Sequence, residues 1–173
     1  DRHKLTDTTI NLFIDKLDKS GVGISIMQNE NLCLVPYTLP GERVKANIIN
    51  KFKSKMYCSN LEILENSSER SNNTCEHFSK CGGCLLQHWQ YENYKQWKFN
   101  LIRQPLLKLT PDIKTLDMVS TENFSRRRAK FFLRQNNNSC KLGFKKYKSE
   151  TLININNCII IDPEIMGFMT EVR

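Results

Sequence analysis

The stretch that decides how this chain folds and what it can bind reads Cys75-Glu76-His77-Phe78-Ser79-Lys80-Cys81-Gly82-Gly83-Cys84. A C-x2-C pair lets two thiolates reach one metal centre, because a tight turn brings both side chains to the same side. Gly82 and Gly83 permit the backbone angles that such a turn needs. Cys75 adds a third thiol nearby, so the stretch predicts a metal-binding loop.

A fourth ligand is expected far downstream, at Cys158. Iron–sulfur clusters commonly use three close cysteines and a remote one, whereas structural zinc sites usually bring two C-x2-C pairs. The spacing therefore favours an iron–sulfur cluster, with zinc, or no metal, as the alternatives. A thioredoxin-like dithiol would not need Cys75, and His77 is a candidate to replace a cysteine ligand.

The other cysteines carry no such pattern. Seven cysteines are an odd number, and no secretion signal is visible, which argues against a disulfide scaffold. Cys33 lies between two leucines in a predicted strand and is expected to be buried filler. Cys58 and Cys140 lack local partners and stay unassigned.

The charge of the chain points to nucleic acid. Its 173 residues include 26 Lys and Arg against 18 Asp and Glu, a net charge of +8. The longest apolar runs are a handful of residues, far below the roughly 20 that a membrane-spanning helix needs. Nine basic residues and one acid at 121–149 equal the entire excess. Aromatic residues alternate with these cations, which suits contacts to phosphates and bases; a solvated surface strand is the plain alternative.

Short strands dominate the first third of the chain. Alternating apolar residues between turn residues predict strands at 9–14, 24–26, 32–35, 44–48 and 61–64. Five strands at this spacing predict a small closed barrel of the oligonucleotide-binding kind. We expect this barrel to occupy residues 1–66, a polar linker 67–74 and a second domain 75–173, which makes the protein a β-rich α+β fold.

The second domain is expected to mix helix and sheet. Residues 88–104 have an apolar stripe at helical spacing that includes Trp89, Tyr94 and Trp97, and Pro105 should end or kink this helix. Strands are predicted at 124–134, 140–147 and 151–155. Asp162 followed by Pro163 predicts the start of a second helix, with aspartate as the N-cap.

Two basic surfaces are candidates for RNA contact. If 124–134 is a strand, one of its faces carries cations with one aromatic ring among them, namely Arg126, Arg128, Lys130, Phe132 and Arg134. Its other face, with Ala129, Phe131 and Leu133, should pack on the helix at 88–104. A second, weaker contact is expected in the barrel at Lys51, Lys53 and Lys55.

Five stretches together resemble one family, the iron–sulfur 23S rRNA (uracil-5-)-methyltransferases. The cysteine stretch, continued through Leu85-Leu86-Gln87-His88, looks like their cluster loop, and Phe124-Ser125-Arg126-Arg127-Arg128-Ala129-Lys130 is similar to one of their strands. Leu142-Gly143-Phe144 and then Asn157-Cys158 with Asp162-Pro163 fit later motifs in order. Leu39-Pro40-Gly41-Glu42-Arg43-Val44 resembles a turn of TRAM domains, which are small RNA-binding barrels.

The resemblance implies a cofactor and a substrate. Family members hold a [4Fe-4S] cluster through four cysteines that match Cys75, Cys81, Cys84 and Cys158, which leaves zinc as a minor alternative. They transfer a methyl group from S-adenosylmethionine to carbon 5 of a uridine in ribosomal RNA, using a C-terminal Rossmann-like domain. We expect this chain to lack that domain, because it has no strand followed by a glycine-rich turn and helix. It would then contain no catalytic residue and be inactive alone.

The expected protein is thus the N-terminal, RNA-recognising and cluster-bearing part of such an enzyme. Its partner would be a 23S rRNA stem-loop with an unpaired uridine, and we expect a cytoplasmic monomer without membrane contact. The competing class is a stand-alone, non-catalytic RNA-binding protein with a metal-stapled domain. A radical enzyme is disfavoured, since it would use C-x3-C-x2-C, and here five residues separate Cys75 from Cys81.

Overall fold

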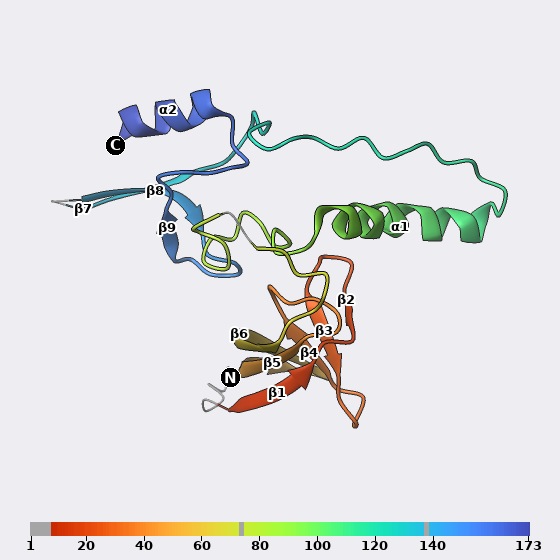
Figure 1. The fold of residues 1–173 in the computed structure, drawn as a ribbon. Helices are drawn as coiled ribbons and strands as arrows, with labels where there is room; N and C mark the ends of the chain where they lie inside the picture. Colours follow the sequence, from red (N-terminus) through yellow and green to blue (C-terminus); the bar gives the residue numbers. More distant parts are fainter. Residues whose placement is uncertain (1–7, 73–74, 137–138) are drawn as a thin grey trace. The chain divides into compact units, whose positions relative to one another are not determined.

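A computed structural model describes residues 8–72, 75–136 and 139–173 (Figure 1). The chain divides into two compact units. Unit 1 consists of 1–72 together with 88–114, and unit 2 of 73–87 together with 115–173. The sequence pattern assigns the segment 88–114 to the second domain, but its contacts are with the first unit. The end of the expected linker, at 73–74, and the tip of the expected turn at 135–139 fall outside the described residues.

Unit 1 is built on a curled six-stranded sheet. Its order is β1-β5-β6-β4-β3-β2, and all neighbours are antiparallel except β4 and β6. The strands are β1 (Thr9–Phe13), β2 (Lys16–Leu17), β3 (Gly23–Ile26), β4 (Leu32–Val35), β5 (Arg43–Phe52) and β6 (Lys55–Glu65). The two outer strands are consecutive in the chain, with only Ile14 and Asp15 between them, so the sheet bends round on itself.

The core of unit 1 follows from alternation along these strands. One face of each strand turns inward, and the cluster comprises Leu12, Ile14, Cys33, Val35, Val44, Ala46, Met56 and Cys58. Cys33 is fully buried, as the sequence predicted. Cys58, which the sequence left unassigned, hydrogen-bonds with Cys33, and this contact together with burial raises the pKa of the Cys58 thiol. The two thiols are therefore core side chains.

The hairpin of β5 and β6 extends well beyond the predicted strands 44–48 and 61–64. The added residues 49–52 of β5 are exposed on both faces, whereas the start of β6 keeps an inward alternation, with Met56 and Cys58 in the core. The turn is made by Lys53, which has a φ of 53°, and Ser54. The strands therefore continue to Phe52 and Lys55, where cross-strand hydrogen bonds rather than burial hold the pair.

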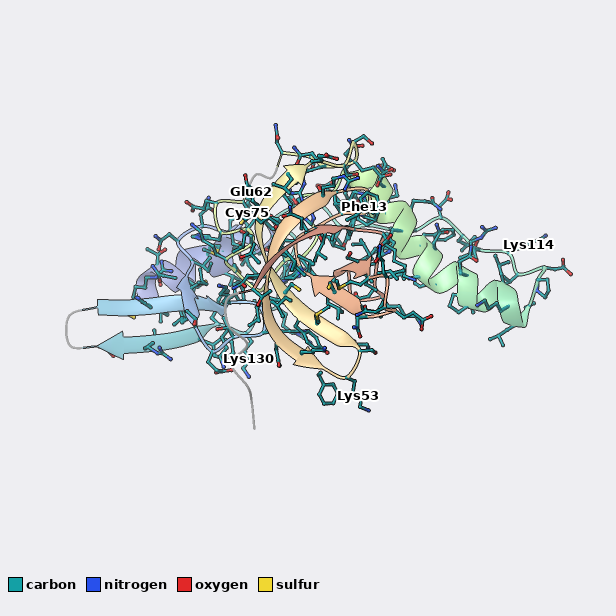
Figure 2. The ribbon with its side chains drawn as sticks, turned by 90° about the horizontal axis from the view of Figure 1, so that it is seen from below. Phe13, Lys53, Glu62, Cys75, Lys114 and Lys130 are labelled. Carbon is teal, nitrogen blue, oxygen red and sulfur yellow. The ribbon has the colours of Figure 1, made fainter. Side chains whose placement is uncertain are left out.

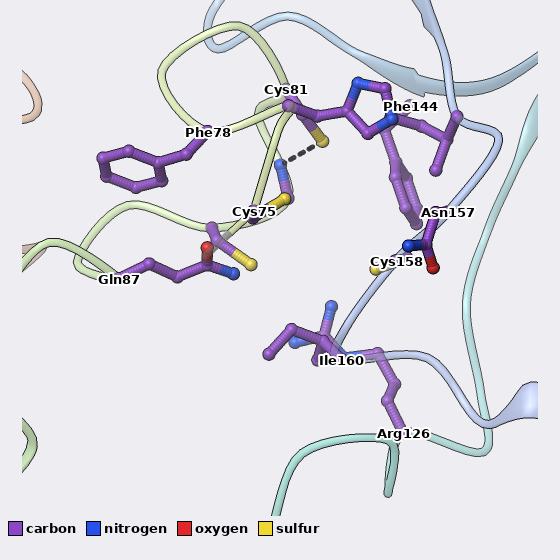
Figure 3. Close-up of a pocket in the computed structure, with 13 residues that line it drawn as sticks. Cys75, Phe78, Cys81, Gln87, Arg126, Phe144, Asn157, Cys158 and Ile160 are labelled. Atoms are coloured by element: carbon purple, nitrogen blue, oxygen red, sulfur yellow. Dashed lines mark hydrogen bonds between the residues drawn. The ribbon is translucent and has the colours of Figure 1, made fainter. Parts of the chain in front are cut away.

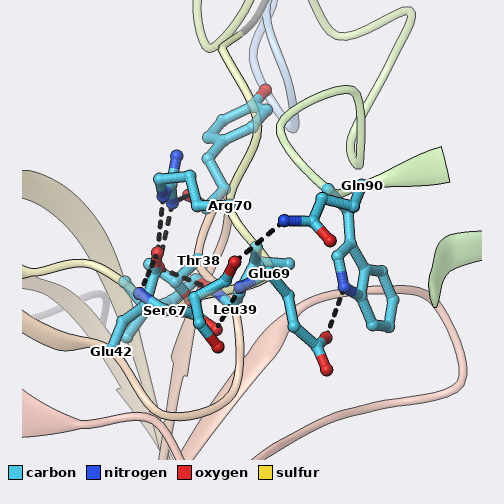
Figure 4. A network of polar contacts seen from close by, with 11 residues as sticks. Thr38, Leu39, Glu42, Ser67, Glu69, Arg70 and Gln90 are labelled. Carbon is cyan, nitrogen blue, oxygen red and sulfur yellow. Dashed lines mark hydrogen bonds and ion pairs between the residues drawn. The ribbon is translucent and has the colours of Figure 1, made fainter.

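A buried ion pair ties the segment after β6 to the curled sheet (Figure 4). The Glu42 side chain is fully buried and accepts hydrogen bonds from the Arg70 guanidinium and from the backbone N–H of Leu39. Arg70 also donates to the carbonyl oxygen of Tyr37, at 3.1 Å. The described part of the expected linker is therefore attached to the sheet, because Glu42 needs a buried partner for its charge.

The helix α1 (Tyr91–Leu109) follows Trp89, whose indole N–H donates to the Glu69 carboxylate at 2.7 Å. Trp89 is buried, as expected, but no residue within α1 is fully buried. Of the two expectations for Pro105, an end or a kink, the end is wrong, since the helix continues for four further residues. Proline lacks the backbone N–H that would donate one helical hydrogen bond. In an exposed helix, water can donate to the carbonyl oxygen that is left without this partner.

Unit 2 holds a three-stranded antiparallel sheet of β7 (Phe132–Asn136), β8 (Ser139–Lys145) and β9 (Leu152–Asn154). It ends with α2 (Pro163–Val172), where Asp162 caps the helix by accepting a hydrogen bond from the backbone N–H of Glu164. This cap confirms the prediction at Asp162 and Pro163. The β-rich composition with few helices is also confirmed.

The predicted strand at 124–134 is wrong over its first eight residues. The ladder with β8 begins only at Phe132, opposite Gly143. Arg126 instead forms an isolated parallel bridge with Ile161. Upstream of Phe132, the chain would have to pair with the end of β8. There the carbonyl oxygen of Lys145 already accepts a hydrogen bond from the backbone N–H of Gly82. The predicted alternation of faces therefore holds only from Phe132 onward.

Candidate metal centre

The four predicted cysteine ligands line one pocket in unit 2 (Figure 3). The cysteine loop 75–84 supplies three of them, and Cys158 comes from the segment between β9 and α2. The rest of the wall is largely apolar, with Phe78, Phe144, Ile155 and Ile160. The structure thus brings together residues that are far apart in the sequence and excludes much of the water around their sulfur atoms.

Backbone hydrogen bonds shape the cysteine loop. The N–H of Phe78 donates to the carbonyl oxygen of Cys75 at 3.1 Å, and the N–H of Cys81 to that of His77 at 2.8 Å. The left-handed backbone angle in the loop belongs to Ser79, with a φ of 65°. Neither glycine of the C-x2-C pair has a positive φ, so the predicted reason for their presence is wrong.

Gly82 is instead required by close packing. Its N–H donates to the carbonyl oxygen of Lys145 at 2.9 Å, and a Cβ atom there would lie 2.7 Å from that same oxygen. The following N–H, of Gly83, points at the Cys81 sulfur at 3.3 Å. An N–H donor beside sulfur stabilises a thiolate or a metal-bound thiolate, and such contacts help to set the potential of iron–sulfur sites.

The thiols interact electrostatically as one group. Burial raises the pKa of Cys81, and the neighbouring Cys158 and Cys75 raise it further. Burial also raises the pKa of Cys84, while a hydrogen bond with the Gln87 side chain and the charge of Arg126 oppose the rise. Four mutually repelling thiolates in an apolar wall are unfavourable without a cation between them.

The described side chains do not form a ready-made metal site. In the part of the chain that the structure describes, no three His, Cys, Asp or Glu side chains are arranged to hold one ion. A tetrahedral zinc with Zn–S bonds of about 2.3 Å needs sulfurs only about 3.8 Å apart. The cavity between the side chains has a volume of about 20 Å³. His77, the predicted substitute ligand, lies in the wall of the cysteine pocket. Its Nε2 atom is 3.4 Å from the Oε1 atom of Glu76.

Sequence reasoning missed three polar or charged members of this wall. Gln87 and Asn157 were not singled out, and Arg126 was assigned to RNA alone. In Figure 3 the Arg126 side chain reaches toward the cysteines. Its backbone explains this position, since its N–H donates to Ile160 and its carbonyl oxygen accepts from Asp162. The sequence gives no sign of this backbone pairing, so only the structure shows that Arg126 lies in the wall of the pocket.

The other predicted RNA-contacting residues of unit 2 form an exposed basic surface around β7. Arg128, Lys130 and Arg134 are exposed. Phe132 is half-buried, and the Nζ atoms of Lys145 and Lys130 lie 4.6 and 5.4 Å from its ring centroid. The expected packing of Leu133 is wrong, since that side chain is 54% exposed, and Phe131 stacks on Phe144 of β8 with centroids 4.9 Å apart.

The predicted barrel residues lie together at the tip of the β5–β6 hairpin (Figure 2). Lys51, Lys53 and Lys55 are all exposed. The Nζ atom of Lys53 lies 5.6 Å from the ring centroid of Phe52, which is itself 61% exposed. A cation beside an exposed ring can contact a phosphate and a base together.

Comparisons with known proteins relate the chain to RNA methyltransferases. It is 34% identical over 160 residues to an uncharacterized RNA methyltransferase from Brucella melitensis. The alignment covers 92% of this chain and 37% of that protein. It is 29% identical over 168 residues to a 23S rRNA (uracil(1939)-C(5))-methyltransferase from Shewanella denitrificans, with 92% and 36% covered. The chain therefore spans little more than a third of these relatives. No family model matches it.

The fold also has a solved counterpart. The crystal structure of the Pyrococcus abyssi tRNA (uracil-54, C5)-methyltransferase, in complex with S-adenosyl-L-homocysteine, aligns with a TM-score of 0.61 over 94% of this chain and 35% of that one. The identity is 19%, so this likeness concerns the fold alone. Among the described residues, no helix is at once long and apolar enough to cross a bilayer.

Proposed function

Because this chain is related over almost its whole length to part of the RNA methyltransferases, uracil-C5-methyltransferases of 23S rRNA among them, we propose that it is the RNA-recognising and cluster-bearing part of an S-adenosylmethionine-dependent rRNA uracil-5 methyltransferase. Unit 1 would be a TRAM-like RNA-binding barrel. Methyl transfer would belong to a further domain, and the 173-residue chain by itself is expected to be inactive.

The pocket that gathers Cys158 with the three loop cysteines carries the cluster part of this proposal. Cys75, Cys81, Cys84 and Cys158 would hold a [4Fe-4S] cluster through their thiolates. The cavity between these side chains has a volume of about 20 Å³, so the cysteine loop would have to move outward to admit a cluster. When bound, the cluster supplies a covalent tie between the loop and the segment before α2.

The residues around the cysteines support this assignment. Apolar side chains exclude water, the N–H of Gly83 faces the Cys81 sulfur, and Arg126 brings a positive charge close to Cys84. A cation and an N–H donor offset the negative charge that four thiolates bring to a cluster. The same tie would hold Arg126 and the basic surface around β7 in a fixed arrangement for RNA.

The RNA part rests on the two exposed basic surfaces. Arg128, Lys130, Phe132 and Arg134 in unit 2 would contact phosphates and an unpaired base, with Arg126 at their edge. Lys51, Lys53 and Lys55 at the hairpin tip would form a second contact. Each phosphate contact adds roughly 0.7 to the salt dependence of binding for single-stranded RNA. The substrate would be a 23S rRNA stem-loop with an unpaired uridine.

Metal analysis of anaerobically purified protein tests the cluster. We expect brown protein with about four irons per chain, and loss of the iron in Cys158→Ser. Cys140→Ser is the matched control, because Cys140 lies in β8 and outside the pocket, and it should keep its iron. One zinc per chain with an unaffected Cys158→Ser variant would contradict the proposal.

Labelled S-adenosylmethionine and unmodified 23S rRNA test the division of labour. The 173-residue chain should bind an rRNA stem-loop but transfer no label, whereas a longer protein that contains it together with a methyltransferase domain should label one uridine at carbon 5. Turnover by the chain alone, or absence of RNA binding, would show that the proposed role is wrong.

A further inference from the structure

A groove in unit 2, distinct from the cysteine pocket, runs along the loop between β8 and β9. Its volume is about 410 Å³, which is within the range of sites for small ligands. Rings and cations dominate its wall, and those that bear on recognition are Phe132, Lys145, Lys146, Tyr147, Lys148 and Glu150. All of these except Glu150 belong to the basic stretch 121–149 that the sequence marks for RNA contact, but only Phe132 was named there as a contact residue.

The rings and cations of this groove are paired. Lys145 lies over Phe132, with its Nζ atom 4.6 Å from the ring centroid, and the Nζ atom of Lys148 lies 5.3 Å from the centroid of Tyr147. Such pairs present an aromatic face and a positive charge within a few ångströms of each other. A nucleotide has the complementary features, a flat base and an adjoining phosphate.

The charge balance favours an anion over a cation. Glu150 is the acid of the wall, and it forms an ion pair with Lys145. Lys146 and Lys148 give the remaining wall a positive formal charge. An apolar ligand would make no ionic contact with these lysines, and a simple inorganic anion would make no stacking contact with the aromatic rings.

The loop is held in shape by its own backbone. The N–H of Lys146 donates to the carbonyl oxygen of Thr151 at 2.8 Å, and the N–H of Ser149 to that of Lys146 at 3.1 Å. The hydrogen bond from Gly82 to Lys145 attaches the loop to the cysteine loop. A site whose backbone is fixed before binding loses less entropy when a ligand enters.

We propose that this groove binds one unpaired nucleotide of the RNA, with the base against Tyr147 or Phe132 and the adjoining phosphates on Lys146 and Lys148. This inference rests on the proposed RNA-binding function and locates part of it in the loop between β8 and β9.

Fluorescence anisotropy with a labelled single-stranded oligouridine tests the groove. In Lys146→Gln/Lys148→Gln, affinity should fall and the slope of log affinity against log salt should decrease by about 1.4, because two phosphate contacts are lost. Tyr147→Ala should weaken binding by roughly 5- to 150-fold if the base stacks there, while Tyr147→Phe should retain it. Lys108→Gln/Lys114→Gln removes the same charge from exposed positions in unit 1 and should change little.

Further arms separate this inference from the proposed function. Iron content and circular dichroism should be unchanged in the groove variants. A duplex RNA should respond less to Tyr147→Ala than the single strand, and uridine monophosphate should bind far more weakly than the oligomer. If groove variants bind like the unaltered chain while Arg128→Glu/Lys130→Glu/Arg134→Glu abolishes binding, the RNA function stands and the groove inference fails. Tight binding of uridine monophosphate without RNA binding would overturn both.

Discussion

The backbone N–H of Gly82 donates a 2.9 Å hydrogen bond to the carbonyl oxygen of Lys145, and this contact joins the cysteine loop to the end of β8. The space for a side chain at Gly82 is already occupied, since a Cβ atom would lie 2.7 Å from that oxygen and 2.9 Å from the Tyr147 nitrogen. Both neighbours are backbone atoms, which cannot turn aside as a flexible side chain can.

Gly82→Ala should therefore separate the loop from β8. We expect a loss of about 1–3 kcal/mol in the free energy of unfolding, as for other overpacked sites, together with lower iron content. Gly167→Ala in α2 is the control, because a Cβ atom at Gly167 would meet nothing within 4 Å, and alanine in a helix should stabilise by up to about 1 kcal/mol. Thermal melting and iron assays give both results; equal melting temperatures for the two variants would contradict the packing argument.

The buried ion pair of Glu42 and Arg70 should respond sharply to the loss of either partner. Arg70→Met leaves the fully buried Glu42 carboxylate without its cation, which should destabilise the protein by about 3–5 kcal/mol in urea unfolding. The exposed pair of Arg43 and Glu65 is the control, since solvent screens both side chains, and Arg43→Met should cost about 1 kcal/mol or less. Similar losses of unfolding free energy at the two pairs would show that burial does not determine how much an ion pair contributes to the stability of this protein.

His88 should make stability depend on pH. Burial, and after it the charge of Arg70, lowers the pKa of His88 to about 4, while Glu42 and a hydrogen bond with the Thr38 backbone oppose the shift. The unfolded chain binds this proton near pH 6.5, so the folded state is fully favoured above that pH and loses stability as the pH falls toward 4. By about pH 5 the loss should be about 2 kcal/mol.

Urea unfolding at neutral pH and at about pH 5 measures this dependence. In His88→Asn the difference between the two pH values should largely vanish, whatever the absolute stability of the variant. His77→Asn is the comparison, and it should keep the dependence. If His88→Asn retained the full difference, another group would have to be its source.

The two basic surfaces should contribute unequally to RNA binding. Arg128→Glu/Lys130→Glu/Arg134→Glu should abolish binding to an rRNA stem-loop and flatten its salt dependence, with the iron content intact. Lys51→Glu/Lys53→Glu/Lys55→Glu should weaken binding less. Each set reverses three exposed charges, so titrations at several salt concentrations compare them directly. A larger loss from the hairpin set would reverse this ranking.

Arg126 should behave differently from its neighbours, because it lies in the wall of the cysteine pocket. We expect Arg126→Gln to bind RNA somewhat more weakly and also to lose iron faster in air than Arg128→Gln, as the charge beside Cys84 is removed. Absorbance of the cluster over time measures the rate. Identical rates in the two variants would confine Arg126 to the RNA role.

Local patterns in the sequence determined much of unit 1 and the membership of the cysteine group. Short-range alternation marked the strands of the curled sheet near Leu12 and Val35, and a cap at Asp162 marked the last helix, because these features depend on neighbours within a few residues. The cysteine spacing identified four thiols that the structure gathers in one pocket. The predicted strands were too short in the β5–β6 hairpin, because residues 49–52 are exposed on both faces and the alternation of Met56 with Cys58 was not recognised.

Only the tertiary structure decided which chemistry surrounds each residue. Arg126 and Arg128 look alike in the sequence and both are exposed, yet only Arg126, which forms a bridge with Ile161, lies in the wall of the cysteine pocket. Gly82 suggested a special backbone angle, but its reason is the approach of Lys145 from far along the chain. Glu42 and Arg70 likewise form a buried ion pair although they lie far apart in the sequence. Long-range contacts are set by the packing of whole elements, and no local pattern of side chains encodes them.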